Sequence, residues 1–356
     1  MNLILFFTDE TAENIIFSGG KGANLSKLKR ASFNVPDGFI VTSQAYNEFI
    51  KNAPFLNDFI GKFDYQNPDV LNQQSAQLKE KLKHVPLPLE LEKTISKAFD
   101  KNPDIKAYSV RSSSTMEDLS GAAFAGQHDT FLNCAGKEEI IARVKDCFIS
   151  LWHDRAIAYR NQKGFSQREA TMAVVVQKMV QADSAGVGFS INPINGNVQH
   201  VLINANFGLG ESVVNGESTV DQFVVNKNDL SIVERIILEK TEKVSSLTQG
   251  TKTEKISKED ALKPSLSDAQ VRMIAQLNIN IENHYKFPQD IEWAIENDEF
   301  FLLQARPITT LPSRWTRDES AERYPNVLTP FTWDFVEKGF HISLDHSFKI
   351  MGLPSF

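Results

Sequence analysis

The 356-residue sequence has few cysteines, no excess of positive charge and no long hydrophobic run. Its two cysteines, Cys134 and Cys147, are too few for a disulfide framework and lack metal-ligand spacing, so we expect two buried thiols in a reducing compartment. The net charge of −7 argues against a nucleic-acid partner, because binding to phosphate backbones depends on clustered Lys and Arg. No apolar stretch reaches the roughly 20 residues that span a bilayer, so we expect a cytoplasmic protein without a membrane partner.

The histidines offer little catalytic chemistry. No two of the seven show i, i+4 metal spacing, and none sits beside a nucleophile-like serine, so the sequence indicates neither a histidine metal site nor a Ser-His-Asp triad. Only His128, inside a loop rich in small residues, is expected near a ligand-binding site. The opening MNLILFFTDE lacks a basic segment and predicts a strand, not a signal peptide.

The length and the patterning predict an α+β protein with more than one lobe. A chain of 356 residues exceeds the usual size of a single hydrophobic core, so a ligand between two lobes is a reasonable expectation. Strands are predicted at 107–111 (AYSVR) and 172–180 (MAVVVQKMV), and a β-rich half at about 186–226. Ser267 and Gln270 predict a capping box before a helix whose apolar face packs on a sheet.

A glycine-rich segment at residues 18–28 (SGGKGANLSKL) predicts a turn that opens a helix. Backbone N–H groups at the helix start and the Lys21 side chain would converge on an anion. An ordinary glycine turn with an exposed lysine explains the same letters, so both interpretations stay open.

A second cluster lies where the strand at 107–111 ends. Arg111 is followed by SSSTMEDLSGAAFAGQHDT, a long loop of small residues, and such loops beside strand ends often carry binding sites. The alternative is that Arg111 only pairs with Glu117 or Asp118.

Residues 289–307 (QDIEWAIENDEFFLLQARP) predict a β-hairpin. A three-residue loop at 297–299 would place Glu292 opposite Gln304 and Asp290 opposite Arg306. The opposite face would then be apolar, carrying Ile291, Trp293, Ile295, Phe301, Leu303 and Ala305.

The polar face of this hairpin has the chemistry of a magnesium and phosphate site. Carboxylate and amide oxygens are ligands that Mg²⁺ takes from proteins, and a neighbouring arginine would neutralise a phosphate. The alternative is a solvated hairpin face with one surface ion pair.

These clusters, in this order, resemble the N-terminal nucleotide-binding region shared by phosphoenolpyruvate synthase, pyruvate phosphate dikinase and rifampicin phosphotransferase. The resemblance covers about residues 15–312. The strings that carry it are GGKGANL at 19–25, VPDGFIVT at 35–42, VRSSSTMEDLSGAAFAGQHDTFLN at 110–133, LWHDRAIAYR at 151–160, NFGLGESVVNG at 206–216 and DIEWAIENDEFFLLQARPIT at 290–309.

The resemblance implies an ATP-grasp fold, in which two α/β lobes clasp Mg-ATP. Catalytic roles at the phosphates would fall to Lys21, Arg111 and Arg306, and magnesium would be held by Glu292 and Gln304 with Asp290 close behind. The nucleotide contacts implied by the family pattern are Lys21, Arg111, Gly126, Thr130, Gln177, Glu292, Gln304 and Arg306.

The same resemblance implies an ATP-dependent phosphotransferase of the dikinase type. It passes a phosphoryl or pyrophosphoryl group to a histidine on a swivelling domain and then to an acceptor: pyruvate, an antibiotic hydroxyl or a pyrrole-type intermediate. Neither the histidine domain nor the acceptor domain is visible in this sequence, so we expect a fragment or a stand-alone subunit. The expected parts are an N-terminal lobe at 1–182, a C-terminal lobe at 183–312 and a linker or following domain at 313–356.

Two other functions remain open at this point. An ATP-grasp carboxylate ligase would use similar cations but release ADP and would need a carboxylate site within these residues. A non-catalytic ATP-binding subunit would bind the nucleotide without turnover.

Overall fold

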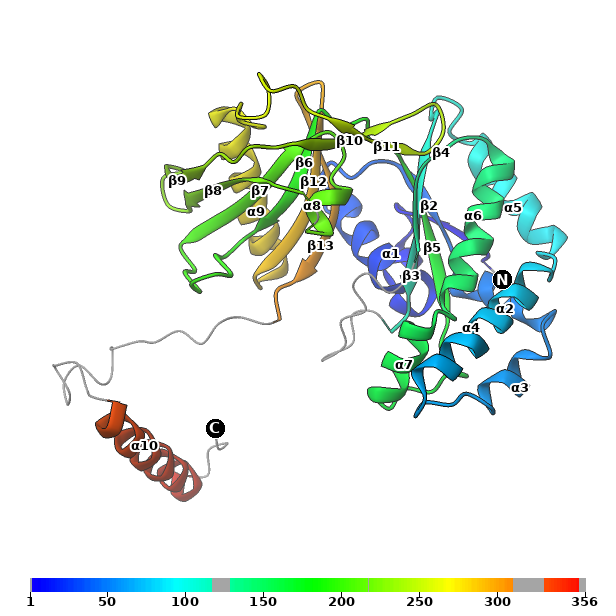
Figure 1. Cartoon of the computed structure of the whole chain (residues 1–356), viewed down its shortest axis with the longest axis horizontal. Coiled ribbons are helices and arrows are strands. Elements are labelled where there is room, and N and C mark those ends of the chain that lie inside the picture. The colour runs from blue at the N-terminus through cyan, green and yellow to red at the C-terminus, as the bar shows by residue number, and fades with distance from the viewer. Residues whose placement is uncertain (1, 117–128, 217, 310–329, 352–356) are drawn as a thin grey trace. The chain divides into compact units, whose positions relative to one another are not determined.

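The computed structural model describes residues 2–116, 129–216, 218–309 and 330–351. The chain forms two compact units, Met1–Thr310 and Leu311–Phe356. Helix α10 (Pro330–Met351) belongs to the second unit, and the remaining helices and strands belong to the first (Figure 1). Helices and strands both contribute substantially, so the predicted α+β class is confirmed.

A five-stranded antiparallel sheet, in the order β1-β2-β5-β3-β4, organises the N-terminal part of the first unit. The predicted strands at 107–111 and 172–180 are confirmed as β3 and β5. The strands are β1 (Ile4–Phe6), β2 (Gly38–Val41), β3 (Tyr108–Ser114), β4 (Thr130–Cys134) and β5 (Met172–Lys178).

Strand β5 contributes to two hydrophobic cores because its side chains alternate between the faces of the sheet. Val174 and Val176 pack in a core with the helices on one face, whereas Ala173 and Val175 belong to the core on the other face. The elements on this half of the chain are η1 (Glu10–Glu13), α1 (Ile15–Arg30), α2 (Ser43–Lys51), α3 (Leu56–Ile60), α4 (Pro68–Lys83), α5 (Leu89–Asp100), α6 (Lys137–Ser150) and α7 (Asp154–Gln162).

Helix α1 differs from the expected glycine turn followed by a helix. It begins at Ile15, and Gly19 then kinks it with φ 66° and ψ 176°. A side chain at Gly19 would place its Cβ 2.1 Å from the backbone oxygen of Ser113, so the close approach to β3 requires glycine. The glycines therefore interrupt a helix instead of preceding one, and a second helical segment starts just before Lys21.

A six-stranded antiparallel sheet, in the order β13-β12-β6-β7-β8-β9, forms the other part of the first unit. The predicted β-rich half at about 186–226 is confirmed in β6, β7 and β8. This part contains β6 (Ser184–Phe189), β7 (His200–Phe207), α8 (Glu211–Val214), β8 (Asp221–Asn226), β9 (Ile232–Ile236), α9 (Asp268–Tyr285), β12 (Gln289–Glu296), β13 (Glu299–Pro307) and a separate ribbon of β10 (Glu242–Ser246) and β11 (Thr251–Lys255).

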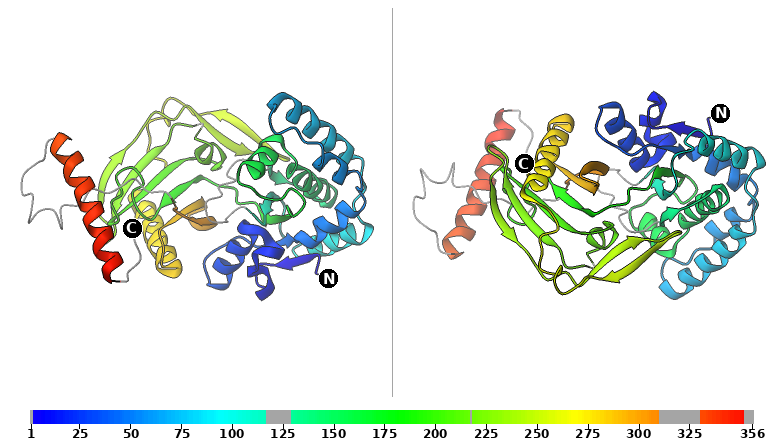
Figure 2. Two further views of the ribbon diagram at one scale, coloured as in Figure 1. Left: turned by 90° about the horizontal axis from the view of Figure 1, so that it is seen from below. Right: turned by 90° about the horizontal axis from the view of Figure 1, so that it is seen from above.

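Helix α9 starts at the capping box predicted from Ser267 and Gln270. The Gln270 side chain accepts from the Ser267 amide at 2.9 Å, and the Ser267 hydroxyl accepts from the Gln270 amide at 3.3 Å. Its buried residues Val271 and Ile274 pack with the six-stranded sheet, which confirms the predicted packing. Helices α1 (blue) and α9 (yellow) lie on the same side of the hairpin β12–β13 (orange) in Figure 2.

One hydrophobic core joins the two sheets. It combines Val175 of β5, Leu25 and Leu28 of α1, Ile274 of α9 and Trp293 of β12. Helix α1 is thus packed against both sheets, which places its Lys21 close to residues of each. No helix within the described ranges is long and apolar enough to cross a membrane.

Candidate functional site

The turn and the register of the hairpin β12–β13 differ from the prediction, although its polar side chains still pair as predicted. The turn has two residues, Asn297 and Asp298, both with positive φ (50° and 62°), and Glu296 pairs with Glu299. The predicted three-residue loop is therefore wrong. Asparagine and aspartate tolerate this left-handed conformation, which suits the tight hairpin turn.

A β-bulge then restores the predicted pairs. Trp293 lies opposite Leu302, but its neighbour Glu292 lies opposite Gln304, so Leu303 is an extra residue. The pairs Glu292–Gln304 and Asp290–Arg306 are confirmed. The placement of Phe301 and Leu303 on the apolar face with Trp293 is wrong: Phe300 and Leu302 pack in that core, whereas Phe301 packs with Ala294 and Leu303 lines a cavity.

Arg111 of β3 reaches across to this hairpin and gathers three acceptors. Its Nη2 donates to Glu292 Oε2 at 2.9 Å and to Gln304 Oε1 at 2.7 Å. Its Nη1 donates to the carbonyl oxygen of the bulged Leu303 at 3.2 Å. The Arg111 and Glu292 side chains are only 12% and 14% exposed, so the contact is largely removed from solvent. The planar guanidinium reaches these acceptors from two separate nitrogens, whereas a lysine carries all its donors on one nitrogen.

A cavity of about 790 Å³ lies at this contact and is lined by both sheets. Its size falls within the range of small-molecule sites. Three cationic and two magnesium-ligating candidates from the sequence line it, together with two further nucleotide candidates: Lys21, Arg111, Arg306, Glu292, Gln304, Thr130 and Gln177.

The glycine-rich segment contributes less backbone to the cavity than predicted. The Gly22 amide donates to the Ser113 hydroxyl at 3.1 Å, and that hydroxyl donates to the Ser18 carbonyl oxygen at 2.8 Å. One of the helix-start N–H groups expected to meet an anion is therefore engaged by β3. The Lys21 side chain does line the cavity.

Asp290 and Arg306 form a second ion pair behind the first, with Arg306 Nε donating to Asp290 Oδ2 at 2.7 Å. Burial raises the pKa of the Asp290 carboxyl, Arg306 opposes that rise and the nearby Glu292 adds to it. Asp290 Oδ1 is buried and has no hydrogen-bond partner among the described residues. Arg306 lines the cavity and Asp290 does not. The polar side chains of the hairpin therefore form two separate pairs, Glu292–Gln304 and Asp290–Arg306, and do not meet at one point.

Gln177 and Thr130 line other parts of the cavity. Gln177 in β5 is 2% exposed, and its amide donates to the Pro36 carbonyl oxygen at 3.4 Å. Thr130 begins β4 directly opposite Arg111. The predicted Gly126, and His128 beside it, lie outside the described residues.

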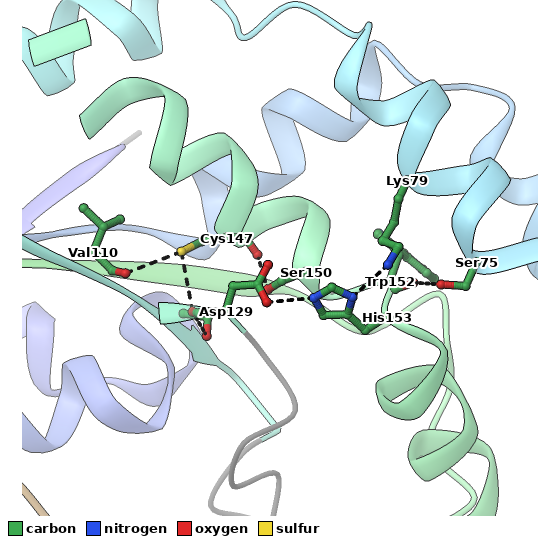
Figure 3. A network of polar contacts seen from close by, with 9 residues as sticks. Ser75, Lys79, Val110, Asp129, Cys147, Ser150, Trp152 and His153 are labelled. Atoms are coloured by element: carbon green, nitrogen blue, oxygen red, sulfur yellow. Dashed lines mark hydrogen bonds and ion pairs between the residues drawn. The ribbon is translucent and has the colours of Figure 1, made fainter. Parts of the chain in front are cut away.

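An Asp129–His153–Lys79 chain extends from the cavity wall and was not predicted (Figure 3). Asp129, which lines the cavity, contacts His153 Nε2 at 2.9 Å, and His153 Nδ1 lies 2.9 Å from Lys79 Nζ on α4. Because the lysine ammonium can only donate, His153 is an acceptor at Nδ1 and a donor to Asp129 at Nε2. Asp129 and His153 are 24 positions apart in the sequence, and no periodic pattern links them.

Both thiols are buried as expected, and Cys147 lies beside Asp129. The Cys147 thiol lies 3.8 Å from the Asp129 carbonyl oxygen and 3.9 Å from that of Val110 (Figure 3). Burial raises the pKa of Cys147 well above its usual value and that of Cys134 to about 12, so neither forms a nucleophilic thiolate near neutral pH.

Among the described residues, no group of three or more His, Cys, Asp or Glu side chains forms a metal site. The magnesium candidates that line the cavity, Glu292 and Gln304, are one carboxylate and one amide, which fits a cation that keeps water and phosphate oxygens in its coordination shell.

Residues 16–326 match the family "Pyruvate phosphate dikinase, AMP/ATP-binding domain". The chain is 38% identical over 320 residues to a probable phosphoenolpyruvate synthase from Methanocaldococcus jannaschii, covering 87% of this chain and 27% of that protein. It is 33% identical over 368 residues to phosphoenolpyruvate synthase from Pyrococcus furiosus, covering 90% and 45%. It is 36% identical over 315 residues to rifampicin phosphotransferase from Bacillus cereus, covering 87% and 36%.

The chain therefore spans less than half the length of each of these relatives. The family match covers most residues of this chain. It includes every cavity residue that was predicted from the sequence. By this match, the chain belongs to the pyruvate phosphate dikinase AMP/ATP-binding domain family.

Proposed function

We propose that this chain binds Mg-ATP between its two sheets and passes a phosphoryl or pyrophosphoryl group to a histidine on a separate swivelling domain. The observation that carries the proposal is the convergence of Glu292 and Gln304 on the cationic Nη2 of Arg111. The arrangement is that of an ATP-grasp fold, with an N-terminal lobe at 1–182, a C-terminal lobe at 183–312 and a linker or following domain at 313–356.

The oxygen donors suit Mg²⁺. Glu292 Oε2 and Gln304 Oε1 already share one cationic partner, so the hairpin presents both oxygens toward a common point. Asp290 adds a buried oxygen with no partner among the described residues. Bound magnesium would neutralise phosphate charge and hold the phosphates in line for transfer. Glu292 and Gln304 would hold it, with Asp290 behind them.

The cations on the cavity wall would act on the phosphates. Lys21 and Arg111 would hold phosphate oxygens, and Arg306 would stabilise charge on the transferring group. Phosphoryl transfer needs positioned charges more than a nucleophile from the protein, which fits a cavity without a reactive thiol or an activated serine among the described residues. Thr130, Gly126 and Gln177 would contact the rest of the nucleotide.

The final acceptor lies outside the residues of this cavity. Two of the relatives are named as phosphoenolpyruvate synthases and one as a rifampicin phosphotransferase. By analogy the acceptor here is pyruvate, an antibiotic hydroxyl or a pyrrole-type intermediate, reached through the histidine domain, and AMP and phosphate are formed overall. Two buried thiols support placing the protein in the reducing cytoplasm.

Glu292→Gln tests the magnesium site. Calorimetric titration with ATP, with and without Mg²⁺, should show at least about a tenfold loss of Mg-ATP affinity in the variant, because an amide replaces the anionic ligand. ATP affinity without Mg²⁺ should change less.

Glu296→Gln is the matched control, since it makes the same chemical change on the same strand at the hairpin turn. It should bind Mg-ATP like the wild type. Equal Mg-ATP affinity in Glu292→Gln and Glu296→Gln would contradict the assignment of Glu292 to the metal.

A further inference from the structure

Asn24 connects three elements around the proposed site. It lies one turn after Lys21 on α1, and its side-chain Nδ2 donates to the carbonyl oxygen of Ala305 in β13. Its Oδ1 accepts from the hydroxyl of Tyr285 in α9. One amide therefore ties α1 to both the hairpin and the helix that supports it.

The point of attachment on β13 lies between two site residues. Ala305 is 2% exposed and stands between Gln304 and Arg306 in the sequence. Its backbone is paired with Ile291 on the other strand, so the segment cannot shift without disturbing the hairpin. A bond to the Ala305 carbonyl oxygen thus fixes the backbone that carries both neighbouring side chains.

The Tyr285 hydroxyl fixes the orientation of the Asn24 amide. Burial raises the pKa of Tyr285, so the hydroxyl keeps its proton and can donate. A donor facing Oδ1 leaves the Asn24 NH₂ group for the carbonyl of Ala305, which can only accept. The three groups therefore form a directed chain from α9 through α1 to β13.

We propose that Asn24 is a positioning residue that sets the distance between Lys21 and the Gln304–Arg306 segment. Lys21 and Asn24 are three residues apart on a helix and lie on one face, so anchoring Asn24 also places Lys21. The inference rests on the proposed function, because it assigns the spacing to the phosphates of bound ATP. Misplacement of such groups by about 1 Å is costly for phosphate binding and transfer.

The chain supplies a matched comparison at Asn34. Its Nδ2 donates to the Phe300 carbonyl oxygen at 2.7 Å and to Glu299 Oε1 at 3.1 Å, so it also ties the segment after α1 to β13. This second tie lies at the hairpin turn, away from Gln304 and Arg306. Asn24 and Asn34 thus both donate a side-chain amide hydrogen bond to a carbonyl oxygen of β13. Only Asn24 does so beside Gln304 and Arg306.

The test compares Asn24→Asp with Asn34→Asp. Both substitutions keep the side-chain shape and remove the NH₂ donor, leaving an oxygen against a carbonyl oxygen. Thermal unfolding followed by circular dichroism gives the stability of each variant, and calorimetry gives its affinity for Mg-ATP and for AMP. Asn24→Asp should weaken Mg-ATP about tenfold and leave AMP within about twofold of the wild type. Asn34→Asp should change neither affinity.

The ratio of Mg-ATP to AMP affinity separates positioning from general destabilisation, because a loosened fold weakens both ligands alike. Tyr285→Phe, which removes only the hydroxyl, should lower that ratio in the same direction by about threefold, and it replaces Asn24→Asp if the latter fails to fold. An unchanged ratio in the folded variant overturns the role of Asn24. If the wild type itself fails to bind Mg-ATP, the proposed function is contradicted and the role of Asn24 with it.

Discussion

Two ion pairs of the first unit, Arg111–Glu292 and Lys240–Asp221, differ in what surrounds them. Arg111 Nη2 and Glu292 Oε2 are 2.9 Å apart, their side chains are 12% and 14% exposed, and both line the cavity. Lys240 Nζ and Asp221 Oδ1 are 2.6 Å apart, and both side chains are 0% exposed. The first pair can meet a ligand, whereas the second is sealed within the protein.

The sealed pair is also satisfied by its own surroundings. Asp221 Oδ2 accepts from the amide of Ser265 at 2.6 Å and from its hydroxyl at 2.8 Å. Lys240 also donates to the Leu238 carbonyl oxygen at 3.1 Å. The difference teaches that a buried ion pair is a candidate for function when an incoming ligand can replace one partner, and is structural when it cannot.

The largest expected effect is on stability, from Lys240→Met. The substitution leaves the Asp221 carboxylate buried without its cation, which should lower the free energy of unfolding by about 3–5 kcal/mol. Urea unfolding monitored by circular dichroism measures the loss. Lys263→Met, which breaks a pair whose side chains are 62% and 51% exposed, is the control and should leave the free energy of unfolding close to the wild-type value. A similar loss in both variants would remove the distinction between sealed and accessible pairs.

Arg111→Lys should affect Mg-ATP affinity more than the free energy of unfolding. Arg111 reaches Glu292 and Gln304 from Nη2 and the Leu303 carbonyl from Nη1, and a lysine, whose three donors sit on one nitrogen, lacks this fork. Mg-ATP affinity should therefore fall about tenfold while the free energy of unfolding changes by about 1 kcal/mol. Calorimetry and urea unfolding on the same preparation give both numbers. Arg143→Lys, in an accessible pair on α6, should leave both close to wild type. A stability loss as large as that of Lys240→Met would instead make Arg111 a structural residue.

The smallest effect is expected at an accessible polar contact, from Asn72→Ala. The Asn72 side chain donates to Asp154 Oδ2 at 2.9 Å and is the main reason that the pKa of Asp154 is lowered. A lowered pKa stabilises the fold above about pH 4, the ordinary range of aspartate, and this contribution is lost as the pH falls through the folded-state pKa. Asn72→Ala should therefore cost about 0.5 kcal/mol at pH 7, since solvent screens this carboxylate, and less at pH 2.5. Urea unfolding at the two pH values measures the difference, and an equal deficit at both would show that the carboxylate is not involved.

Local patterns predicted the elements well because they depend on neighbouring residues. The β-branched run in MAVVVQKMV predicted β5, and Ser267 with Gln270 predicted the start of α9. The pairs Glu292–Gln304 and Asp290–Arg306 were correct although the loop length was not, because the bulge at Leu303 shifts the register by one residue and offsets the shorter turn. The ligand roles of all the site candidates stay predictions: Lys21, Arg111, Gly126, Thr130, Gln177, Asp290, Glu292, Gln304 and Arg306.

The sequence by itself therefore determined the α+β class, the main strands and the capped helix. Six sequence segments in a fixed order also determined the family. Only the tertiary structure decided that Leu303 bulges to offer its carbonyl to Arg111, that Ser113 occupies the Gly22 amide, and that His153 meets Asp129. The physical reason is that each of these contacts joins residues far apart in the chain or resets a register locally. The contacts of Leu303 and of Gly22 depend on the packing of two sheets against α1 and α9, which no local pattern encodes.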